Sequence, residues 1–358
     1  MKRSSVKRRF VRLAVFAMGL AAAMVLAEAL VLLFVGEQPK FPRRVVAAPW
    51  GLRYNDPGAT YRHKSRDGTW QFTINRQGMR ADRDYHYVKP PGRLRVLVVG
   101  DSFAIGYEVG VEQTFAMVLE RELRRRNVDV EVLNAGVSGY STAEAALYLE
   151  RELIKYQPDV VVSSAYENDF ADNLRSDLLR LESTGLVAGH ESYVPAGGLG
   201  DFLNTTPLFN LLSERSNAFA FAKEQVTLVV KTAMEQAGGK AAEPQHPDDL
   251  KSRLDYERRL LAAIVERMYA FLHARNIPLV ILSIPRQTPA AELVDGFPCE
   301  LLDLSRPGLE FVSGKEVLAP LATTNALYNR FSLNHWTPVA HEAAGKALAN
   351  LDLWRTLE

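Results

Sequence analysis

The sequence predicts an α/β protein, a three-layer α/β/α sandwich with a mainly parallel sheet, plus one N-terminal transmembrane helix. Two observations lead to this fold class. After residue 93, short apolar runs alternate with stretches of helical spacing, an order typical of βαβ units. Before residue 36, one long apolar stretch follows a cluster of basic residues, as in a membrane anchor.

The apolar stretch at 13–35 reads LAVFAMGLAAAMVLAEALVLLFV. At about 1.5 Å per residue, a helix of this length can cross a hydrocarbon core of about 30 Å. The basic tail at 1–12 predicts that this end stays in the cytoplasm and that the rest faces outward. A cleaved signal peptide is the alternative, because residues 27–29 (AEA) resemble a cleavage site. Glu28 is costly in a span unless it is protonated, reaches the interface or is paired.

Residues 36–92 are rich in Pro, Arg, Tyr and Gly, with one strand-like run at 69–75 and a turn at 75–79. We interpret them as a juxtamembrane segment that packs on the main domain at 93–358. Residues from about 171 to 249 interrupt the alternating pattern of that domain with helical pieces and loop-like stretches. This part is interpreted as an insertion.

Four strands are expected in the main domain, because four short apolar runs suit burial on both faces of a sheet. They are 94–100, 130–136, 158–166 and 278–285. Helices are expected at 112–126, 142–156, 250–275 and 335–351. Ser141 or Thr142 is the expected N-cap of the second helix, because a hydroxyl can accept from the free N–H groups of a first turn.

The charge of the chain argues against a nucleic-acid partner. It has 43 basic and 42 acidic residues, and six of the basic residues lie in the first 35 positions with a single acid. The remainder is slightly acidic, whereas nucleic-acid surfaces need basic patches. The single cysteine, Cys299, cannot form an intrachain disulfide, and no Cys/His spacing suggests zinc. Neither a metal nor another cofactor is therefore expected.

Distinctive residues follow three of the predicted strands at the points where the strands end: Ser102, Gly136 and Asn168. In open α/β sheets ligands bind outside the carboxyl ends of the strands, so these residues are expected to face one crevice. A serine hydroxyl there can attack a carbonyl carbon, and the N–H groups of Ser102 and Gly136 with the Asn168 amide can hold the oxyanion. The structural alternatives are helix caps for Ser102 and Asn168 and a tight turn for Gly136.

A nucleophilic serine needs a base, which is usually histidine. The chain has seven histidines. His335 stands at the start of the last predicted helix, next to the loop ahead of it, from which a side chain can reach the strand ends. His341 lies within that helix and is expected to pack or cap. His335 is therefore the candidate base, and a packed loop histidine is its structural alternative.

Together these blocks resemble the SGNH, or GDSL, hydrolase superfamily in its membrane-anchored bacterial type, from residue 93 to about 353. Residues 100–102 (GDS) match the nucleophile block, and 134–136 (NAG) match the glycine block. Asn168 matches the third block, whose first glycine is replaced by Tyr166, and His335 matches the histidine block. The resemblance implies a flavodoxin-like fold with Ser102 and His335 as catalytic residues.

One departure from the superfamily concerns the residue that orients the histidine. Its members usually have Asp two or three residues before that histidine, where this chain has Leu333 and Ser332. An aspartate orients the imidazole and stabilises its cation. Three explanations stay open. Ser332 or the backbone orients His335, an acid from elsewhere such as the insertion replaces the Asp, or the protein is weakly active or inactive.

The resemblance implies a serine-dependent ester hydrolase or O-acyltransferase that forms an acyl-enzyme on Ser102. Water as acceptor makes it a deacylase, and a sugar hydroxyl makes it an acyltransferase. An anchor in the bacterial cytoplasmic membrane with a periplasmic catalytic domain favours O-acetylated envelope glycan or exopolysaccharide as the substrate. The alternative is a non-catalytic envelope protein of the same fold that binds glycan or joins a biosynthetic complex. The sequence identifies no protein partner.

Overall fold

The computed structural model describes residues 2–194, 206–238, 250–331 and 335–357. Its centre is a five-stranded sheet in the order β13-β10-β7-β5-β6, and every neighbouring pair is parallel. The strands are β5 (Leu94–Val99), β6 (Val130–Asn134), β7 (Val160–Ala165), β10 (Leu279–Ser283) and β13 (Leu309–Ser313). Counted along the chain, this is the flavodoxin-like order 2-1-3-4-5, whose switch point lies between β5 and β7.

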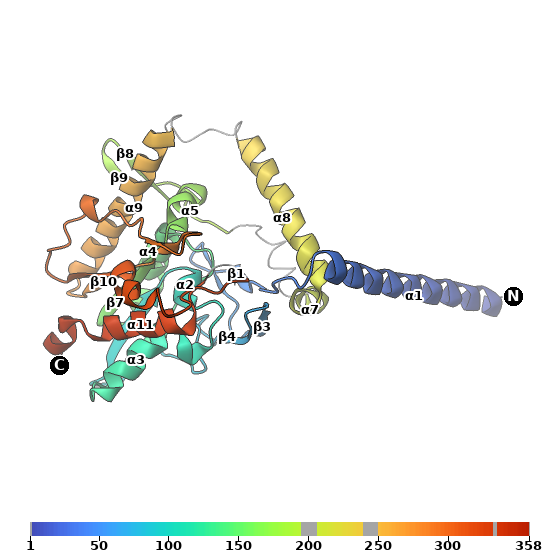
Figure 1. Ribbon diagram of the computed structural model, residues 1–358, viewed down its shortest axis with the longest axis horizontal. Helices are drawn as coiled ribbons and strands as arrows, with labels where there is room; N and C mark the ends of the chain where they lie inside the picture. The colour runs from blue at the N-terminus through green and yellow to red at the C-terminus, as the bar shows by residue number, and fades with distance from the viewer. Residues whose placement is uncertain (1, 195–205, 239–249, 332–334, 358) are drawn as a thin grey trace.

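Helices cover both faces of the sheet (Figure 1). Alternate residues of each strand point to opposite layers. Val96 and Val98 of β5 pack with α3 (Phe115–Arg125) and α11 (Pro338–Ala349). Leu97 and Val99 pack with α4 (Thr142–Arg151) and α9 (Leu250–His273) on the other face. The predicted three-layer α/β/α sandwich is confirmed.

All four predicted strands and all four predicted helices of the main domain are present, with shorter ends. Ser141, rather than Thr142, caps α4, because its hydroxyl accepts from the Glu144 N–H while the Glu144 carboxylate accepts from the Ser141 N–H. Strand β13 is absent from the prediction. It is an edge strand that pairs on one side only, and its sequence LEFVS lacks the long apolar run of a central strand.

The remaining short elements of the main domain lie near the ends of these strands. They are α2 (Ser102–Ile105), β11 (Arg286–Gln287), β12 (Leu293–Val294) and α10 (Gly314–Leu318). Helix α2 begins three residues after β5 ends, and α10 follows β13 directly. Both therefore lie at the carboxyl edge of the parallel sheet.

The segment before the sheet folds as two small antiparallel sheets. Strand β1 (Val45–Ala47) pairs with β2 (Arg53–Asn55), and β3 (Thr60–Lys64) pairs with β4 (Thr69–Thr73), the run predicted at 69–75. Phe72 and Ile74 share a core with Ile105 and Tyr107 of the main domain. This segment therefore belongs to the folded body that carries the sheet.

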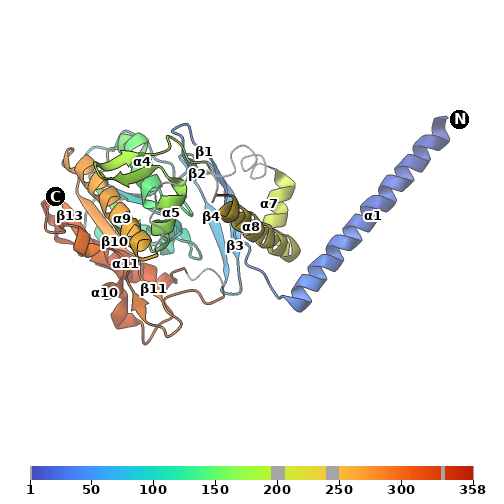
Figure 2. The ribbon, with the colours of Figure 1, turned by 90° about the horizontal axis from the view of Figure 1, so that it is seen from above.

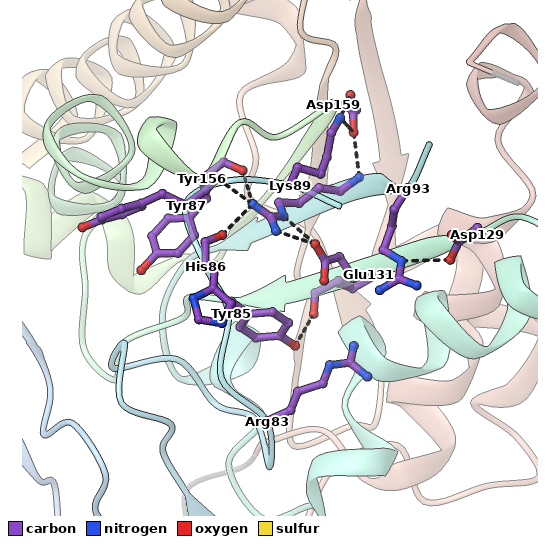
Figure 3. A network of polar contacts seen from close by, with 12 residues as sticks. Arg83, Tyr85, His86, Tyr87, Lys89, Arg93, Asp129, Glu131, Tyr156 and Asp159 are labelled. Carbon is purple, nitrogen blue, oxygen red and sulfur yellow. Dashed lines mark hydrogen bonds and ion pairs between the residues drawn. The ribbon is translucent and has the colours of Figure 1, made fainter. Parts of the chain in front are cut away.

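A network of ion pairs closes the amino end of the sheet (Figure 3). Arg95, in β5, is almost fully buried, and its Nε donates to Glu131 of β6 at 2.7 Å. The Arg95 guanidinium also donates to the carbonyl groups of His86, Tyr87 and Tyr156. These contacts tie the end of the juxtamembrane segment to the first two strands.

Helix α1 (Lys2–Phe34) projects from the body (Figure 2). Its stretch Arg8–Phe34 is long and apolar enough to cross a membrane, by length and composition, and its apolar window is unburied. The part of the chain interpreted as an insertion, at about 171–249, contains four elements after α5 (Asn168–Ser176) among its described residues. They are the hairpin of β8 (Leu179–Glu182) and β9 (Gly185–Ala188), α7 (Pro207–Arg215) and α8 (Asn217–Gly238). In both views α7 and α8 stand between the body and α1 (Figures 1 and 2).

Candidate active site

Ser102 is held at the carboxyl end of β5 by a sharp turn into α2. Gly100 has φ +146, and a Cβ there would come within 2.1 Å of the Ser164 Oγ, so only glycine fits this turn. The cap of α2 is Asp101, whose Oδ1 accepts from the Phe103 N–H at 2.9 Å. The alternative of Ser102 as N-cap is therefore wrong, and its hydroxyl is available for another partner.

That partner is His335. Its Nε2 lies 2.8 Å from the Ser102 Oγ, although the two residues are 233 positions apart in the chain. The imidazole is almost fully buried and packs between the rings of Phe103 and Tyr107, with centroids at 5.0 and 5.1 Å. The hydrogen bond between the two side chains is the pairing that a serine nucleophile and its base require.

Behind His335 stands a carboxylate that the sequence analysis did not identify. The Oε2 of Glu108 lies 3.5 Å from the His335 Nδ1, on the side of the ring opposite Ser102. Glu108 is fully buried and has φ +61, a left-handed conformation that side chains other than glycine rarely adopt. Glu108 lies in the connection between β5 and α3, outside the insertion that we suggested as a source of such an acid. Ser332, the other candidate, lies outside the described residues.

Arg80 of the juxtamembrane segment shapes the turn that carries Glu108. Its guanidinium is fully buried and donates to the carbonyl groups of Ile105 at 2.7 Å, Val109 at 2.6 Å and Gly106. Burial lowers the pKa of Arg80 to about 9, so the group remains a cation at neutral pH. Three converging carbonyl groups around one cation fix the turn on both sides of Glu108.

Tyr107 joins the catalytic turn to an aromatic cluster in the juxtamembrane segment. Its ring lies edge-on to His63, with centroids at 4.6 Å, and edge-on to Phe72 at 5.6 Å. The Tyr107 ring also contacts the His335 ring. Edge-to-face aromatic pairs contribute about 0.5–1.5 kcal/mol beyond the area they bury. The base is thus supported by residues of the segment that precedes the sheet.

The three candidate oxyanion donors differ in their present hydrogen-bond partners. The Ser102 N–H lies at the first position of α2, where a helix leaves its amide without an intrahelical partner. The Gly136 N–H donates to the Asn134 Oδ1 at 3.1 Å, and the Asn168 Nδ2 donates to the Asp172 Oδ2 at 3.0 Å. An amide nitrogen of Asn has a second hydrogen, so Asn168 can serve a further acceptor.

Gly136 is required for packing on α2. A Cβ on it would come within 2.4 Å of the Ile105 backbone nitrogen and 2.8 Å of the Ala104 carbonyl carbon. The atoms that a Cβ would meet belong to the helix that carries Ser102. Gly136 therefore allows the nucleophile turn to lie close to the end of β6.

Two buried carboxyl groups flank the nucleophile. Asp101 and Asp169 are both almost fully buried, and the Oδ2 of Asp169 accepts from the Tyr166 N–H at 2.8 Å. Burial raises the pKa of both groups, and their mutual repulsion raises that of Asp169 further. Glu167, rather than Asn168, is the N-cap position of α5, which removes the capping alternative for Asn168.

The other histidine of the C-terminal region has a structural position. His341 is fully buried, stacks on Phe115, and its Nδ1 accepts from the Phe115 N–H at 3.2 Å. Burial lowers its pKa to about 3, so it is neutral at physiological pH. It caps the start of α3 from the neighbouring helix, in agreement with the expectation that it packs or caps.

Comparisons with known proteins return enzymes that act on esters. No family model matches the chain. An arylesterase from Vibrio mimicus is 32% identical over 75 residues, which are 21% of this chain and 38% of that protein. The chain thus matches well under half the length of this curated relative. A lipase from a goat rumen metagenome has a TM-score of 0.40 and 15% identity, over 72% of this chain and 97% of that one.

A lipolytic protein of the G-D-S-L family from Desulfitobacterium hafniense is also similar in structure. Its TM-score is 0.35 with 12% identity, over 71% of this chain and 97% of that one. The G-D-S-L family, to which that protein is assigned, is the one that the sequence motifs resemble.

Proposed function

We propose that this chain is a serine esterase of the SGNH (GDSL) type, in which Ser102 is the nucleophile and His335 the general base. Glu108 is the positioning residue that orients the base. The observation that carries the proposal is the line of three side chains in hydrogen-bond and ion-pair order: Ser102, His335 and Glu108. Nucleophile, base and orienting acid in this order are the arrangement of serine hydrolases on several unrelated folds.

The chemistry proceeds in two halves. His335 Nε2 takes the Ser102 hydroxyl proton as the Oγ attacks the ester carbonyl carbon, and the carbonyl oxygen becomes an oxyanion. The C–O bond to the alcohol then breaks, and His335 gives its proton to the leaving oxygen. Ser102 is left as an acyl ester, which a second acceptor attacks by the same steps in reverse. Glu108 stabilises the imidazolium that exists between the two proton transfers.

The oxyanion needs donors that are already in place, and each is worth about 3–4 kcal/mol of barrier. The Ser102 N–H is the first of them, because it belongs to the nucleophile itself. The Asn168 Nδ2 and the Gly136 N–H complete the set, each after exchanging or sharing its present partner. Catalytic hydrogen bonds often tighten only when substrate binds.

A cavity of about 530 Å³ adjoins Asn168 and provides room for a substrate. Tyr166, Phe170 and Leu254 supply apolar lining, while Glu257 and Arg258 supply charge. We propose that it holds the acyl or alcohol part of the ester. With water as acceptor the enzyme is a deacylase, and with a sugar hydroxyl it is an O-acyltransferase. We further propose that α1 anchors the protein in a bacterial cytoplasmic membrane, with the body in the periplasm and O-acetylated envelope glycan as the substrate class.

The competing hypothesis, a non-catalytic protein that binds glycan or joins a biosynthetic complex, arose from the missing aspartate. Glu108 offers a carboxylate at the position where that aspartate would act. The reason for preferring an inactive protein is thereby weakened, and the two hypotheses differ in one measurable property. An active serine reacts with a fluorophosphonate, whereas a serine without a base does not.

The test uses the full chain purified in detergent. We expect a fluorophosphonate probe to label the wild type, and Ser102→Ala and His335→Ala to lose at least about 10³-fold in labelling rate. His341→Ala is the matched control and should label at nearly the wild-type rate. Equal labelling of wild type and Ser102→Ala contradicts the enzyme hypothesis, and a greater loss in His341→Ala overturns the choice of base. Acetate release from an acetyl donor that does not respond to added oligosaccharide excludes transfer to sugar.

A further inference from the structure

Glu28, the acid in the apolar stretch of α1, is hydrogen-bonded to the first turn of α8. Its carboxylate accepts from the backbone N–H groups of Asn217 at 2.8 Å and Ala218 at 3.0 Å. It also accepts from the Asn217 Nδ2 at 2.7 Å and the Ser216 Oγ at 2.8 Å. A helix N-terminus has free N–H groups and a partial positive charge, so a carboxylate stabilises it. Glu28 is the cap of α8, supplied by α1.

A second set of bonds holds the same junction. The Oδ1 of Asn217 accepts from the Lys40 Nζ at 2.6 Å and from the Gln38 N–H at 2.9 Å. Asn217, Lys40 and Gln38 are all buried. The chain just after α1 and the start of α8 are thus joined through one asparagine. The start of α8 is therefore fixed at the level of Glu28.

This level lies inside the apolar stretch. Residues 13–27 make only about 22 Å of helix, which is less than a hydrocarbon core of about 30 Å. If α1 crosses a membrane, Glu28 therefore lies below the outer surface of the hydrocarbon. The four hydrogen bonds to α8 offset the cost of a carboxylate at that depth. The first turn of α8, which supplies those bonds, then lies at the same depth.

The residues around this junction are suited to such a position. Helix α8 begins with the apolar sequence NAFAFA at 217–222. On α7, which precedes it, Leu208 is 62% exposed and Leu211 is 49% exposed. Both helices lie on the side of the body from which α1 extends (Figures 1 and 2). Large apolar side chains exposed next to a membrane span are stabilised by lipid contact.

We propose that α7 and the start of α8 form a second membrane-contact element, seated at the outer boundary between headgroups and acyl chains. The occupant of the exposed face of α7 is lipid of the bilayer that α1 crosses. The inference rests on the proposed membrane anchor and is independent of the esterase chemistry. It gives the body two points of attachment, α1 and α7–α8, linked by Glu28, so that the body takes one orientation on the membrane.

The test uses the full chain in vesicles of phosphatidylethanolamine and phosphatidylglycerol. Cys299→Ala removes the only cysteine, and single cysteines are then introduced as L208C or L211C and labelled with an environment-sensitive fluorophore. V88C and L301C are matched controls, because Val88 and Leu301 are exposed apolar residues of the body. L20C, within α1, reports whether α1 is inserted. Some vesicles carry lipids with a doxyl quencher near the headgroup or near the bilayer centre.

We expect the labels on α7 to lose fluorescence with the quencher near the headgroup more than with the one near the centre. The labels at positions 88 and 301 should stay unquenched. Labels on α7 that remain open to a water-soluble quencher overturn the proposal. Labels shielded from water but unaffected by the lipid quenchers also overturn it, because protein, such as a second copy of the chain, then covers the face in place of lipid. Loss of quenching at position 20 would instead contradict the anchor, and fluorophosphonate labelling reports the esterase chemistry separately.

Substitution of Glu28 tests the link between the two elements. Glu28→Leu removes both carboxylate oxygens that accept from the start of α8, whereas Glu28→Gln keeps one oxygen. We expect lipid quenching of the label at position 208 to fall in the order wild type, Glu28→Gln, Glu28→Leu, while the label at position 20 stays quenched in all three. Equal quenching of the label at position 208 in all three would show that Glu28 does not hold α7–α8 at the membrane.

Discussion

Buried polar groups at the two ends of the parallel sheet differ in their hydrogen bonding. At the amino end, Arg95 finds Glu131 and three carbonyl groups, and its own N–H donates to Asp159 at 2.7 Å. At the carboxyl end, Asp101 Oδ2, Ser164 Oγ and Asn168 Oδ1 are buried without a hydrogen-bond partner within the described part of the chain. The buried polar groups named at the amino end are hydrogen-bonded, whereas the oxygen atoms named at the carboxyl end, called the open end below, lack a partner among the described residues.

The difference indicates which end is arranged for stability and which for chemistry. Buried polar groups are normally hydrogen-bonded, because leaving one unpaired costs about 1–3 kcal/mol. Proteins keep unpaired polar groups at sites that must bind a substrate, despite this cost in stability. Substitutions at the two ends should therefore separate activity from stability.

The largest effect is expected from Glu108→Gln. The amide keeps the shape of the side chain but loses the charge that stabilises the imidazolium. We expect kcat on a short-chain ester to fall by about 10²- to 10⁴-fold, with little change in the melting temperature. Glu112→Gln, an exposed acid in the same connection, is the control and should keep wild-type kcat. An unchanged kcat in Glu108→Gln would mean that another group orients His335.

At the amino end, Arg95→Met should act on stability alone. It leaves the Glu131 carboxylate buried without its cation, which typically costs about 3–5 kcal/mol. Denaturant unfolding should show this loss, while kcat of the folded fraction stays within about two-fold of wild type. The double variant with Glu131→Leu removes the stranded charge and should regain part of the stability. A fall in kcat without a loss of stability would contradict the inference that the amino end serves stability and the carboxyl end serves chemistry.

At neutral pH the smallest effect is expected at His341, which borders the open end but accepts a hydrogen bond from the Phe115 N–H. Its pKa is lowered from 6.5 to about 3 in the fold. Between these values the unfolded chain binds a proton that the folded chain does not, so stability is lost as the pH falls, by at most about 1.4 kcal/mol per pH unit. His341→Gln removes this titration and keeps an acceptor for the Phe115 N–H. Its free energy of unfolding should therefore depend less on pH between 6.5 and about 3 than that of the wild type, and equal slopes would contradict a neutral buried His341.

The central strands and the pairing of Ser102 with His335 were accessible from the sequence. Runs such as LRVLVVG predict a strand buried on both faces, and Ser102 lies two residues after the end of that run. His335 was accessible because the loop ahead of the last helix ends at the same edge of the sheet. In both cases the signal lies in one short stretch of chain.

Glu108 carries no such signal. In the sequence it is one acid in the loop GYEVG, and its burial and left-handed backbone arise from Arg80 and Tyr107 packing against distant residues. The superfamily places the orienting aspartate close to the histidine in sequence, where this chain has Ser332 and Leu333. The one hint was topological: a loop that follows the nucleophile helix lies at the edge where His335 must arrive. The role of Glu28 was likewise invisible, because its partner Asn217 is 189 residues away.

Ser102 and Glu108 lie in one connection, between β5 and α3, while His335 comes 233 positions after Ser102. Two members of the proposed triad are therefore made early in translation and must wait for the third. A nascent chain, or one cut anywhere before residue 335, carries its serine and its carboxylate without a base. Under the proposed chemistry the hydrolase is inactive until His335 has been synthesised. It becomes active only when α11 packs against the sheet and His335 reaches Ser102.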